Sequence, residues 1–427
     1  MRKKIAIRLG LLIIILFCIV VEVIIDTFAG NIQSMTLMGI YYGSGIIWGI
    51  ILMILGGIVF TEHHFENGFW YFLQHWIITN RLERQMIDAG FCIQRGKIID
   101  IPKIKLSLSK DLSTGCLYIR NALKFDNKLD KATMSSALGR YIVDYHYLTD
   151  DGNYYVYELI EGSTSFKLTF NSFTEFLKHN YTIQQYELFL DNRSIVKLQS
   201  CLLVGITGSG KSYGLYNFVI QMLNKIVPYK IFFADPKGSS LEIIGTAVAE
   251  ERTAADIQPI IRLLEEFVGL MQERKKELRH CLSNKIDADY SDFGLSPMVF
   301  ICDEYASFAS VLAAEDKATR DKVKGLLYQI ILQGRQLGCF LFLVMQKSDA
   351  TLIDTALRDN VPLKIVLGNS EQQTYVTTFG AGITIPNRHY VIGEGVFTEP
   401  EIAPEPKLVQ LPQFNFDILK AIKAPEV

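Results

Sequence analysis

The longest hydrophobic segments of the chain lie near its N-terminus. A 17-residue apolar run, Leu9–Ile25, is interrupted only by Gly10 and Glu22, and a 26-residue run, Met35–Phe60, contains no charged residue. A helix of about 20 residues crosses the roughly 30 Å hydrocarbon core of a bilayer. The pattern therefore predicts a transmembrane hairpin of two helices within residues 1–61.

Basic residues around these two runs predict how the hairpin is oriented. Four of them precede the first run, none lies between the runs, and Arg81 and Arg84 follow the second. Because lysine and arginine collect on the cytoplasmic side, both termini are expected in the cytoplasm, with the chain in the cell membrane and the lipid bilayer as a partner. A cleaved signal peptide is the alternative for the first run, but no small-x-small cleavage motif follows it.

The region after the hairpin changes character twice. An aromatic stretch with Phe65, Phe69, Trp70 and Trp76 predicts a juxtamembrane interfacial helix over residues 62–90. Residues 91–185 then show short runs of alternating hydrophobic and polar residues, typical of strands, with one helical segment. The strands are expected at 104–108, 116–119, 141–147 and 154–159, and the helix at 131–139. This region is predicted to be a small α+β module.

Longer buried strands that alternate with helices predict a parallel α/β sheet over residues 186–400. Five runs qualify as strands, at 201–205, 230–234, 298–302, 339–345 and 363–367. A short strand pair near Val391 and Val396 follows, and residues 401–427 are expected to be a proline-containing tail. Ligands of such sheets bind at the carboxyl ends of the strands, so the chemistry is expected there.

Composition narrows the classes of function. Hydrophobic residues make up 49% of the chain and charged residues 21%, which excludes a disordered protein, and the net charge of −2 excludes a chain that is basic overall. A local excess does exist, because 95–131 holds nine basic and four acidic residues. A solvated face near an anionic membrane and a surface for DNA or a partner both remain open. The seven cysteines form no CxxC pair, so no zinc site or disulfide framework is expected.

The first predicted strand of the sheet runs into a phosphate-binding motif. Residues 205–212 match GxxxxGK[ST]; they are Gly205, Ile206, Thr207, Gly208, Ser209, Gly210, Lys211 and Ser212. Glycines let the backbone wrap around phosphates so that its N–H groups point at negative charge. Lys211 is expected to reach the β and γ phosphates and Ser212 to bind Mg²⁺. The motif predicts ATP or GTP as ligand.

Two further strand ends supply candidates for catalysis. The strand at 298–302 ends in Asp303 and Glu304, and the strand at 339–345 ends in Gln346. In P-loop enzymes the first acid holds Mg²⁺ and a neighbouring carboxylate activates the attacking water. Asp303 is therefore a predicted metal ligand and Glu304 the predicted general base. Gln346 is placed to sense the γ-phosphate, and a loop glutamine without a role is the alternative.

Together these motifs resemble the FtsK/SpoIIIE family of membrane-anchored DNA-translocating ATPases. The resemblance covers residues 188–397 and includes Asp235-Pro236-Lys237, the 271–274 stretch Met-Gln-Glu-Arg, and the 334–338 segment Gly-Arg-Gln-Leu-Gly. The 357–362 segment, Leu-Arg-Asp-Asn-Val-Pro, is similar to another family element. The resemblance implies a RecA-like sheet with the P-loop strand at its centre, ATP and Mg²⁺ as ligands, and a homohexameric ring.

The resemblance also assigns roles to three basic residues. Arg335 stands where the family places an arginine that reaches the γ-phosphate of the neighbouring subunit. Lys347 and Arg358 stand where the family has basic residues that contact DNA phosphates. Lys347-Ser348 replaces the family's usual Arg-Pro, which weakens the assignment of Lys347.

Within the family, the short chain and the predicted anchor resemble the FtsK-like coupling proteins of conjugative plasmids and integrative conjugative elements. This implies a DNA translocase that brings DNA and its relaxase to a conjugation channel. Three alternatives remain: an FtsK-like ATPase that powers protein secretion, a chromosome-type DNA translocase, and a membrane scaffold that uses ATP only as a switch.

Overall fold

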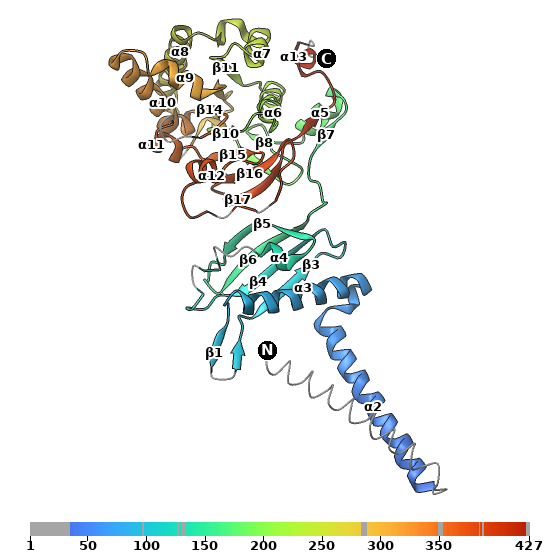
Figure 1. Cartoon of the computed structure of the whole chain (residues 1–427). Coiled ribbons are helices and arrows are strands. Elements are labelled where there is room, and N and C mark those ends of the chain that lie inside the picture. Colours follow the sequence, from blue (N-terminus) through green and yellow to red (C-terminus); the bar gives the residue numbers. More distant parts are fainter. Residues whose placement is uncertain are drawn as a thin grey trace. The chain divides into compact units, whose positions relative to one another are not determined.

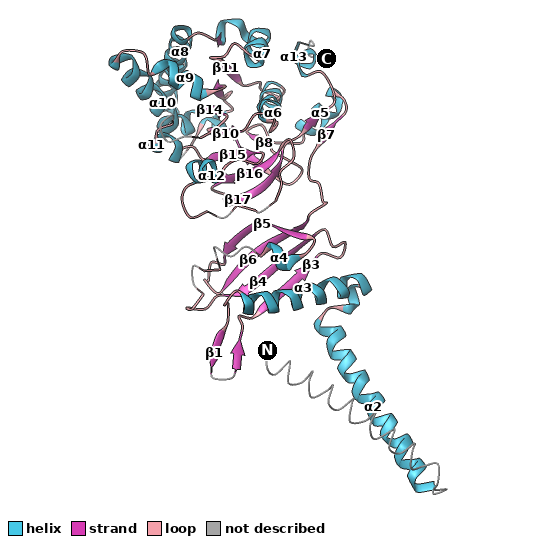
Figure 2. Ribbon diagram, in the orientation of Figure 1, coloured by secondary structure: helices cyan, strands magenta, loops and turns pink. Residues whose placement is uncertain are grey.

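The computed structural model describes residues 35–423 except 96–97, 126–127, 130–133, 283–287, 349–352, 384 and 387. It divides the chain into two compact units, Met1–Thr164 and Ser165–Val427. Each unit contains its own sheet and its own hydrophobic core. The two units are described separately below (Figures 1 and 2).

The first unit contains two long helices and a four-stranded antiparallel sheet. The sheet has the strand order β3-β4-β6-β5, and β1 and β2 form a separate hairpin. The elements are α2 (Met35–Glu62), a 3-10 turn (Phe65–Asn67), α3 (Phe69–Asp88), β1 (Ile93–Arg95), β2 (Ile98–Asp100), β3 (Ile104–Leu108), β4 (Thr114–Arg120), α4 (Ser135–Leu138), β5 (Tyr141–Leu148) and β6 (Tyr154–Glu161). The four strands expected between residues 104 and 159 are therefore present. The expected helix at 131–139 is α4, although 131–133 lie outside the described residues.

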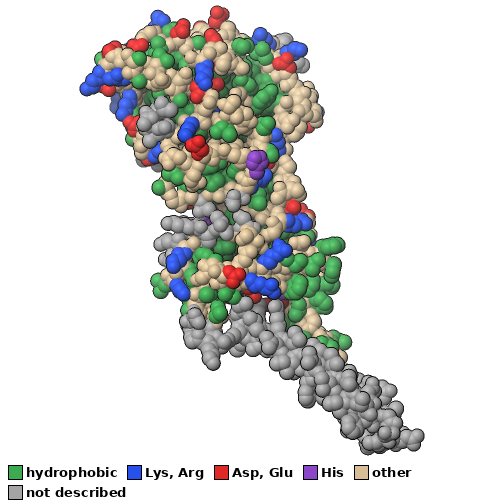
Figure 3. Space-filling view, viewed as in Figure 1, with side chains coloured by type: hydrophobic (Ala, Val, Ile, Leu, Met, Phe, Trp, Pro, Cys, Tyr) green, Lys and Arg blue, Asp and Glu red, His purple; other side chains and the backbone are tan. Residues whose placement is uncertain are grey.

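Helix α3 is amphipathic, and its two faces have different neighbours. Residues at helical spacing, among them Ile78, Leu82 and Met86, are buried and pack on the sheet strands. Aromatic residues at the start of the helix remain exposed, with Phe69 58% and Trp70 68% accessible. Figure 3 shows hydrophobic side chains gathered over this end of α3.

The predicted transmembrane hairpin is not supported by the structure. The first predicted span, 9–25, lies outside the described residues. Helix α2 covers the second predicted span, but no helix in the described part of the chain has the length and hydropathy needed to cross a bilayer.

The second unit is built around an eight-stranded mixed sheet with the order β12-β11-β13-β14-β10-β15-β16-β17. Its strands are β10 (Cys201–Gly205), β11 (Lys230–Ala234), β12 (Thr253–Ala254), β13 (Met298–Cys302), β14 (Cys339–Met345), β15 (Leu363–Leu367), β16 (Glu394–Glu399) and β17 (Ala403–Gln410). Four short strands lie outside it: β7 (Thr169–Phe170), β8 (Glu187–Phe189), β9 (Ile195–Lys197) and β18 (Gln413–Phe414). The helices are α5 (Phe173–Asn180), α6 (Lys211–Leu223), α7 (Ser240–Ala249), α8 (Ile257–Leu282), α9 (Tyr305–Leu312), α10 (Lys317–Leu337), α11 (Thr355–Asp359), α12 (Gln372–Phe379) and α13 (Ile418–Lys423).

The five strands predicted from hydrophobic runs are β10, β11, β13, β14 and β15, with the predicted bounds. All five pair in parallel, and β10 lies between β14 and β15, so the P-loop strand is central as expected. Two strands, β16 and β17, continue the sheet in antiparallel pairing. The sheet is therefore mixed, with a parallel centre and an antiparallel edge.

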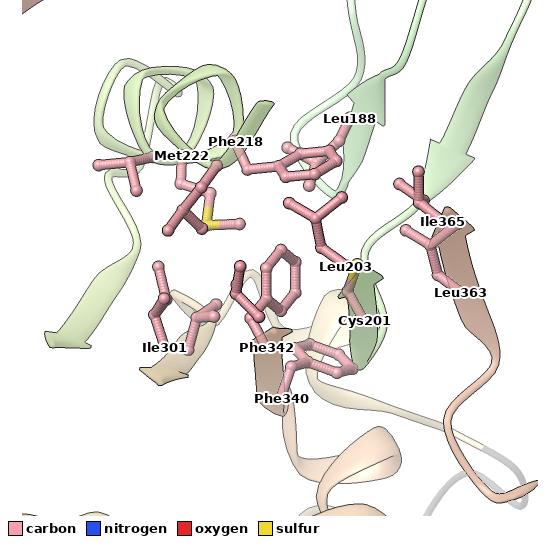
Figure 4. Packing of buried hydrophobic residues seen from close by; sticks show 14 of the residues in the cluster. Leu188, Cys201, Leu203, Phe218, Met222, Ile301, Phe340, Phe342, Leu363 and Ile365 are labelled. Carbon is pink, nitrogen blue, oxygen red and sulfur yellow. The ribbon is translucent and has the colours of Figure 1, made fainter. Parts of the chain in front are cut away.

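Helices cover both faces of the parallel part of this sheet, and its central strands β10, β13 and β14 contain no charged residue. Figure 4 shows Phe218 and Met222 of α6 against Leu203 of β10 and Phe342 of β14. The Phe218 and Phe342 rings meet edge to face with centroids 5.7 Å apart. Helices α8 and α10 lie on the opposite face (Figure 1), where Phe267 contacts Phe232 and Phe300.

The C-terminal residues return to the start of the unit. Strand β18 pairs in parallel with β7, and the rings of Phe414 and Phe170 stack with centroids 6.0 Å apart. Between β17 and β18, Leu411 packs against Gly214 of α6, where a Cβ atom would lie 2.5 Å from the leucine side chain. The segment 401–423 thus contributes β17, β18 and α13 to the second unit.

Replacing either of two glycines of α10 with alanine is expected to change the stability of the second unit, in opposite directions. A Cβ atom at Gly334 would overlap the carbonyl oxygen of Cys339, whereas Gly325 has open space around it. Gly334→Ala is expected to destabilise the second unit by about 1–3 kcal/mol through overpacking. Gly325→Ala should stabilise it by up to about 1 kcal/mol through helix propensity. Differential scanning calorimetry of the two variants measures both shifts, and equal melting temperatures would contradict the packing at Gly334.

Candidate nucleotide-binding and catalytic site

The loop between β10 and α6 has the backbone expected of a phosphate cradle. Gly208 and Gly210 adopt φ angles of 81° and 92°, in the left-handed region that favours glycine, and α6 begins at Lys211. The loop is held from outside, because the Gly393 backbone N–H donates to the Ser209 carbonyl oxygen at 2.8 Å. The free N–H groups of the first helical turn of α6 lie at this loop, and they suit an anion.

A recess of about 450 Å³ brings the predicted catalytic residues together at the carboxyl edge of the parallel strands. Its lining includes Lys211, Ser212, Asp303, Glu304 and Gln346, each predicted from the sequence. The other lining residues are Ile206, Thr207, Gly208, Gly210, Tyr213, Lys237, Ser239 and Ile392.

Glu304 is the most constrained residue of the recess. It follows β13 with φ 50° and ψ 55°, which residues other than glycine rarely adopt. Its Oε2 atom lies 3.3 Å from the Lys211 Nζ and 3.2 Å from the Lys237 Nζ. Burial by itself would raise the pKa of Glu304, but attraction by the two lysines outweighs it, so the pKa is lowered. Glu304 is therefore held as a carboxylate.

Asp303 has a different environment from its neighbour. Burial raises its pKa, and its Oδ1 accepts a hydrogen bond of 2.9 Å from the Glu304 backbone N–H. The Ser212 hydroxyl lines the same recess, so the two side chains offer only oxygen donors. Mg²⁺ prefers such donors and keeps water and phosphate oxygens as its other ligands. Asp303 and Ser212 therefore fit the predicted Mg²⁺ site.

Gln346 follows β14 and lies beside the P-loop in the recess. Its Oε1 atom is 3.5 Å from the Thr207 hydroxyl, which donates to it. The side chain is thus placed beside the backbone that would hold phosphates.

A second, more apolar recess of about 350 Å³ adjoins the first. The two recesses share Gly210, Tyr213 and Ile392, and the second is closed by Leu411, Pro412 and Phe414 of the C-terminal segment. Lys167 lies at its rim, where its Nζ donates to the Ile392 carbonyl oxygen at 3.3 Å.

The three basic residues assigned by resemblance lie outside the phosphate recess. Arg335 lines a separate cavity of about 540 Å³ with Lys275, Arg279 and others. The Nζ of Lys347 lies 2.8 Å from the Glu371 carboxylate, and the side chain is half exposed. Arg358 is largely buried and pairs with Asp359 at 2.7 Å.

Several lining residues had no assigned role in the sequence. Lys237 follows the end of β11, so the rule that ligands bind at strand ends gave a signal for it. Ile392 and Gly393 come from a loop about 180 residues beyond the P-loop, and no local pattern marks them.

The comparisons with known proteins agree with the motifs. Residues 164–331 match the model of the FtsK/SpoIIIE family, so the predicted resemblance is confirmed for this domain. The FtsK domain-containing protein YdcQ of Bacillus subtilis is 28% identical over 184 residues, which are 43% of this chain and 37% of the relative. The DNA translocase FtsK of Bacillus cereus is 23% identical over 202 residues, or 44% and 24% of the two chains. The chain thus spans little more than a third of these relatives at most.

Solved structures were also compared. The pCW3 conjugation coupling protein TcpA, in a monomer form with ATPγS, is 17% identical and superposes with a TM-score of 0.49 over 81% of this chain and 99% of TcpA. A structure of EssC ATPases 2 and 3 from Geobacillus thermodenitrificans is 16% identical, with a TM-score of 0.43 over 55% of this chain and 44% of EssC.

The contact between Lys211 and Glu304 predicts opposite effects of two substitutions on nucleotide binding. Lys211→Ala removes a charged phosphate contact and should weaken binding of a non-hydrolysable ATP analogue about 10- to 100-fold. Glu304→Gln removes a competitor for the Lys211 ammonium, so its affinity should equal or exceed that of the unchanged chain. Isothermal titration calorimetry decides this, and equal weakening by both substitutions would contradict the assigned roles.

Proposed function

We propose that this chain, through its FtsK/SpoIIIE-family domain, is an ATPase that translocates DNA. One observation carries the proposal: a single recess holds the P-loop lysine, the two carboxylates after β13 and Gln346. A protein that only bound nucleotide would need the P-loop alone. The adjacent carboxylates supply what hydrolysis adds, a position for the metal and a base for the attacking water.

In the proposed reaction, the loop N–H groups and Lys211 hold the phosphates, and Glu304 accepts a hydrogen bond from a water molecule. The water oxygen forms a bond to the γ-phosphorus as the bond to the β-γ bridging oxygen breaks, and the proton passes to the Glu304 carboxylate. ADP leaves with that bridging oxygen. Asp303 and Ser212 would hold Mg²⁺, which neutralises charge on the β and γ phosphates when bound.

The apolar recess beside the P-loop is the proposed site of the nucleotide base. It begins at Gly210 and Tyr213, where the phosphate recess ends, so a nucleotide can occupy both. Tyr213 is 59% exposed and offers a ring on which a base can stack. The C-terminal residues Pro412 and Phe414 provide apolar walls.

Arg335 is proposed to act on the nucleotide of a neighbouring copy. It lines a cavity different from the phosphate recess, so it does not face a nucleotide bound in the recess of its own subunit. Lys275 and Arg279 share that cavity and suit an anionic partner group. A ring of copies, proposed here as a homohexamer, would place this cavity against the next subunit's phosphates.

The proposed DNA contacts require two ion pairs to open. Lys347 is paired with Glu371 and Arg358 with Asp359. DNA phosphates would replace these carboxylates, and contacts of that kind are independent of base sequence. The basic region 95–131 stays a second candidate surface.

We further propose that the cargo is delivered to a conjugation channel, with a relaxase and channel proteins as partners. The sequence resemblance to FtsK-like coupling proteins of conjugative elements supports this finer statement. Relatives that are DNA translocases, such as FtsK of Bacillus cereus, support the more general statement that the cargo is DNA.

Hydrolysis that depends on DNA is the central prediction. The full-length chain should hydrolyse ATP faster when single- or double-stranded DNA is added, because contacts with the cargo are coupled to the reaction. Glu304→Gln should lower the stimulated rate at least about 100-fold, as loss of a general base does. Phosphate release measures the rate, and a donor cell carrying this variant should lose conjugative transfer.

Outcomes that contradict the proposal are equally specific. No stimulation by DNA, together with stimulation by a secreted polypeptide, would assign the domain to protein export. Absence of hydrolysis by the unchanged chain would favour the alternative of a scaffold that uses ATP only as a switch.

The proposed role of Arg335 is tested with mixtures of two chains. Mixing Arg335→Ala chains with unchanged chains should lower the rate by more than dilution does. Rates strictly proportional to the share of unchanged chains would exclude a role of Arg335 in the neighbouring site.

We propose membrane attachment from an apolar run in the sequence and from the exposed aromatic residues at the start of α3 and just before it. The charge-free run Met35–Phe60 and the exposed aromatic residues Phe65, Phe69 and Trp70 suit a lipid environment, with the ATPase domain in the cytoplasm. The full-length chain should float with liposomes in a density gradient and resist extraction by carbonate. Trp70→Ala with Phe69→Ala should weaken flotation of a chain that starts at residue 62, and free sedimentation of the full-length chain would contradict the proposal.

A further inference from the structure

Lys237 lies on the loop that connects β11 to α7. Strand β11 pairs with β13, and Glu304 lies just after the end of β13. Its Nζ is 3.2 Å from Glu304 Oε2, and its side chain is 44% exposed, whereas that of Glu304 is only 10% exposed. An ammonium group thus reaches the carboxylate from the open side of the recess.

The loop that presents Lys237 is fixed by a buried carboxylate. Asp235 is fully buried, and its oxygens accept hydrogen bonds from the backbone N–H groups of Lys237, Ser239 and Glu242. The Ser239 hydroxyl also donates to it at 2.7 Å. A carboxylate with this many donors fixes the start of α7, as helix-capping residues do. The position of the Lys237 backbone is therefore determined by the fold.

Glu304 needs support from its neighbours because of its own backbone. It occupies the left-handed region at φ 50°, and such a conformation costs about 1–3 kcal/mol unless surrounding contacts hold it. Its Oε2 atom is in contact with both ammonium groups. The Lys237 Nζ lies 3.2 Å from it and the Lys211 Nζ 3.3 Å. The two lysines therefore act on the same oxygen.

A nucleotide changes this balance, because only one of the two lysines belongs to the P-loop. Lys211 is the residue expected to contact the β and γ phosphates, so binding of ATP draws its ammonium away from Glu304. Lys237 comes from a different loop. It can keep its contact with Glu304 while phosphates occupy the cradle.

We propose that Lys237 is a positioning residue that holds the Glu304 carboxylate in its catalytic orientation once ATP has engaged Lys211. The inference rests on the proposed ATPase function and adds a residue to it. It predicts that loss of the Lys237 ammonium slows hydrolysis without weakening nucleotide binding. A lysine that contacted the phosphates itself would do the reverse.

The test compares Lys237→Met, Lys237→Arg and Lys420→Met in the full-length chain with DNA present. Methionine keeps the apolar stem and removes the charge, and Lys420, 87% exposed on α13, is a matched surface control. Lys237→Met should lower kcat about 10- to 100-fold, as misplacement of a catalytic group does, with KM unchanged within about 2-fold. Lys237→Arg should recover most of kcat, and Lys420→Met should match the unchanged chain.

A double substitution separates positioning through Glu304 from other effects. In a Glu304→Gln chain, adding Lys237→Met should change the residual rate less than about 2-fold, because its target has gone. Binding of a non-hydrolysable ATP analogue by each variant shows that the site is folded. If Lys237→Met folds poorly, Lys237→Gln, which removes the charge and keeps a polar end, replaces it in both the single and the double substitution.

Each other result overturns the inference in a recognisable way. A raised KM with unchanged kcat would place Lys237 on the nucleotide, and unchanged values of both would remove its role. An equal loss of rate in both backgrounds would show an effect that bypasses Glu304. If the unchanged chain does not hydrolyse ATP at all, the proposed function fails first, and that outcome is visible before any Lys237 variant is measured.

Discussion

Strand β10 is hydrogen-bonded on both of its sides, to β14 and to β15, and the rest of the candidate nucleotide site depends on this position. A strand with two parallel neighbours has no freedom to shift, because the register of each ladder fixes it. The loop after β10 therefore leaves the sheet at a defined point, next to the end of β14 and one strand away from the end of β13. There the P-loop contacts residues that are distant along the chain. Lys211 contacts Glu304, 93 residues later, and Thr207 contacts Gln346, 139 residues later.

This geometry explains why so much of the site could be predicted. A strand buried on both faces is a continuous apolar run, and the polar residue that ends it is visible in the sequence. Cys201–Gly205 and Met298–Cys302 are such runs, followed by the P-loop and by Asp303. Parallel strands in one sheet then force their carboxyl ends to the same edge. The position of Lys211 beside Glu304 follows from these two facts.

Other features depend on contacts that leave no local pattern. Gly393 reaches the P-loop through one backbone hydrogen bond to Ser209, and neither residue type predicts it. Strand β17 contains Pro404 and Pro406, which indicate a linker in the sequence, yet the strand lies at the edge of the sheet where proline is tolerated. Arg335 lies outside the phosphate recess, and only the family resemblance gave it a role. Hydropathy likewise predicted a span at Met35–Phe60, but no helix of the described residues has the length and hydropathy needed to cross a bilayer.

The pairing of β18 with β7 has a consequence for how the second unit is made. The Phe166 backbone N–H donates to the side chain of Gln410, 244 residues further along the chain. Closing so long a loop costs entropy that only the completed contacts repay, and topologies of this kind fold slowly. Strand β7 is synthesised long before its partner β18, so this pairing can form only after nearly the whole unit has been made. An unfinished chain would carry the whole phosphate-binding motif but lack the wall formed by Leu411, Pro412 and Phe414. The phosphate-binding motif is therefore only one part of the proposed nucleotide site, which also needs residues from the end of the second unit.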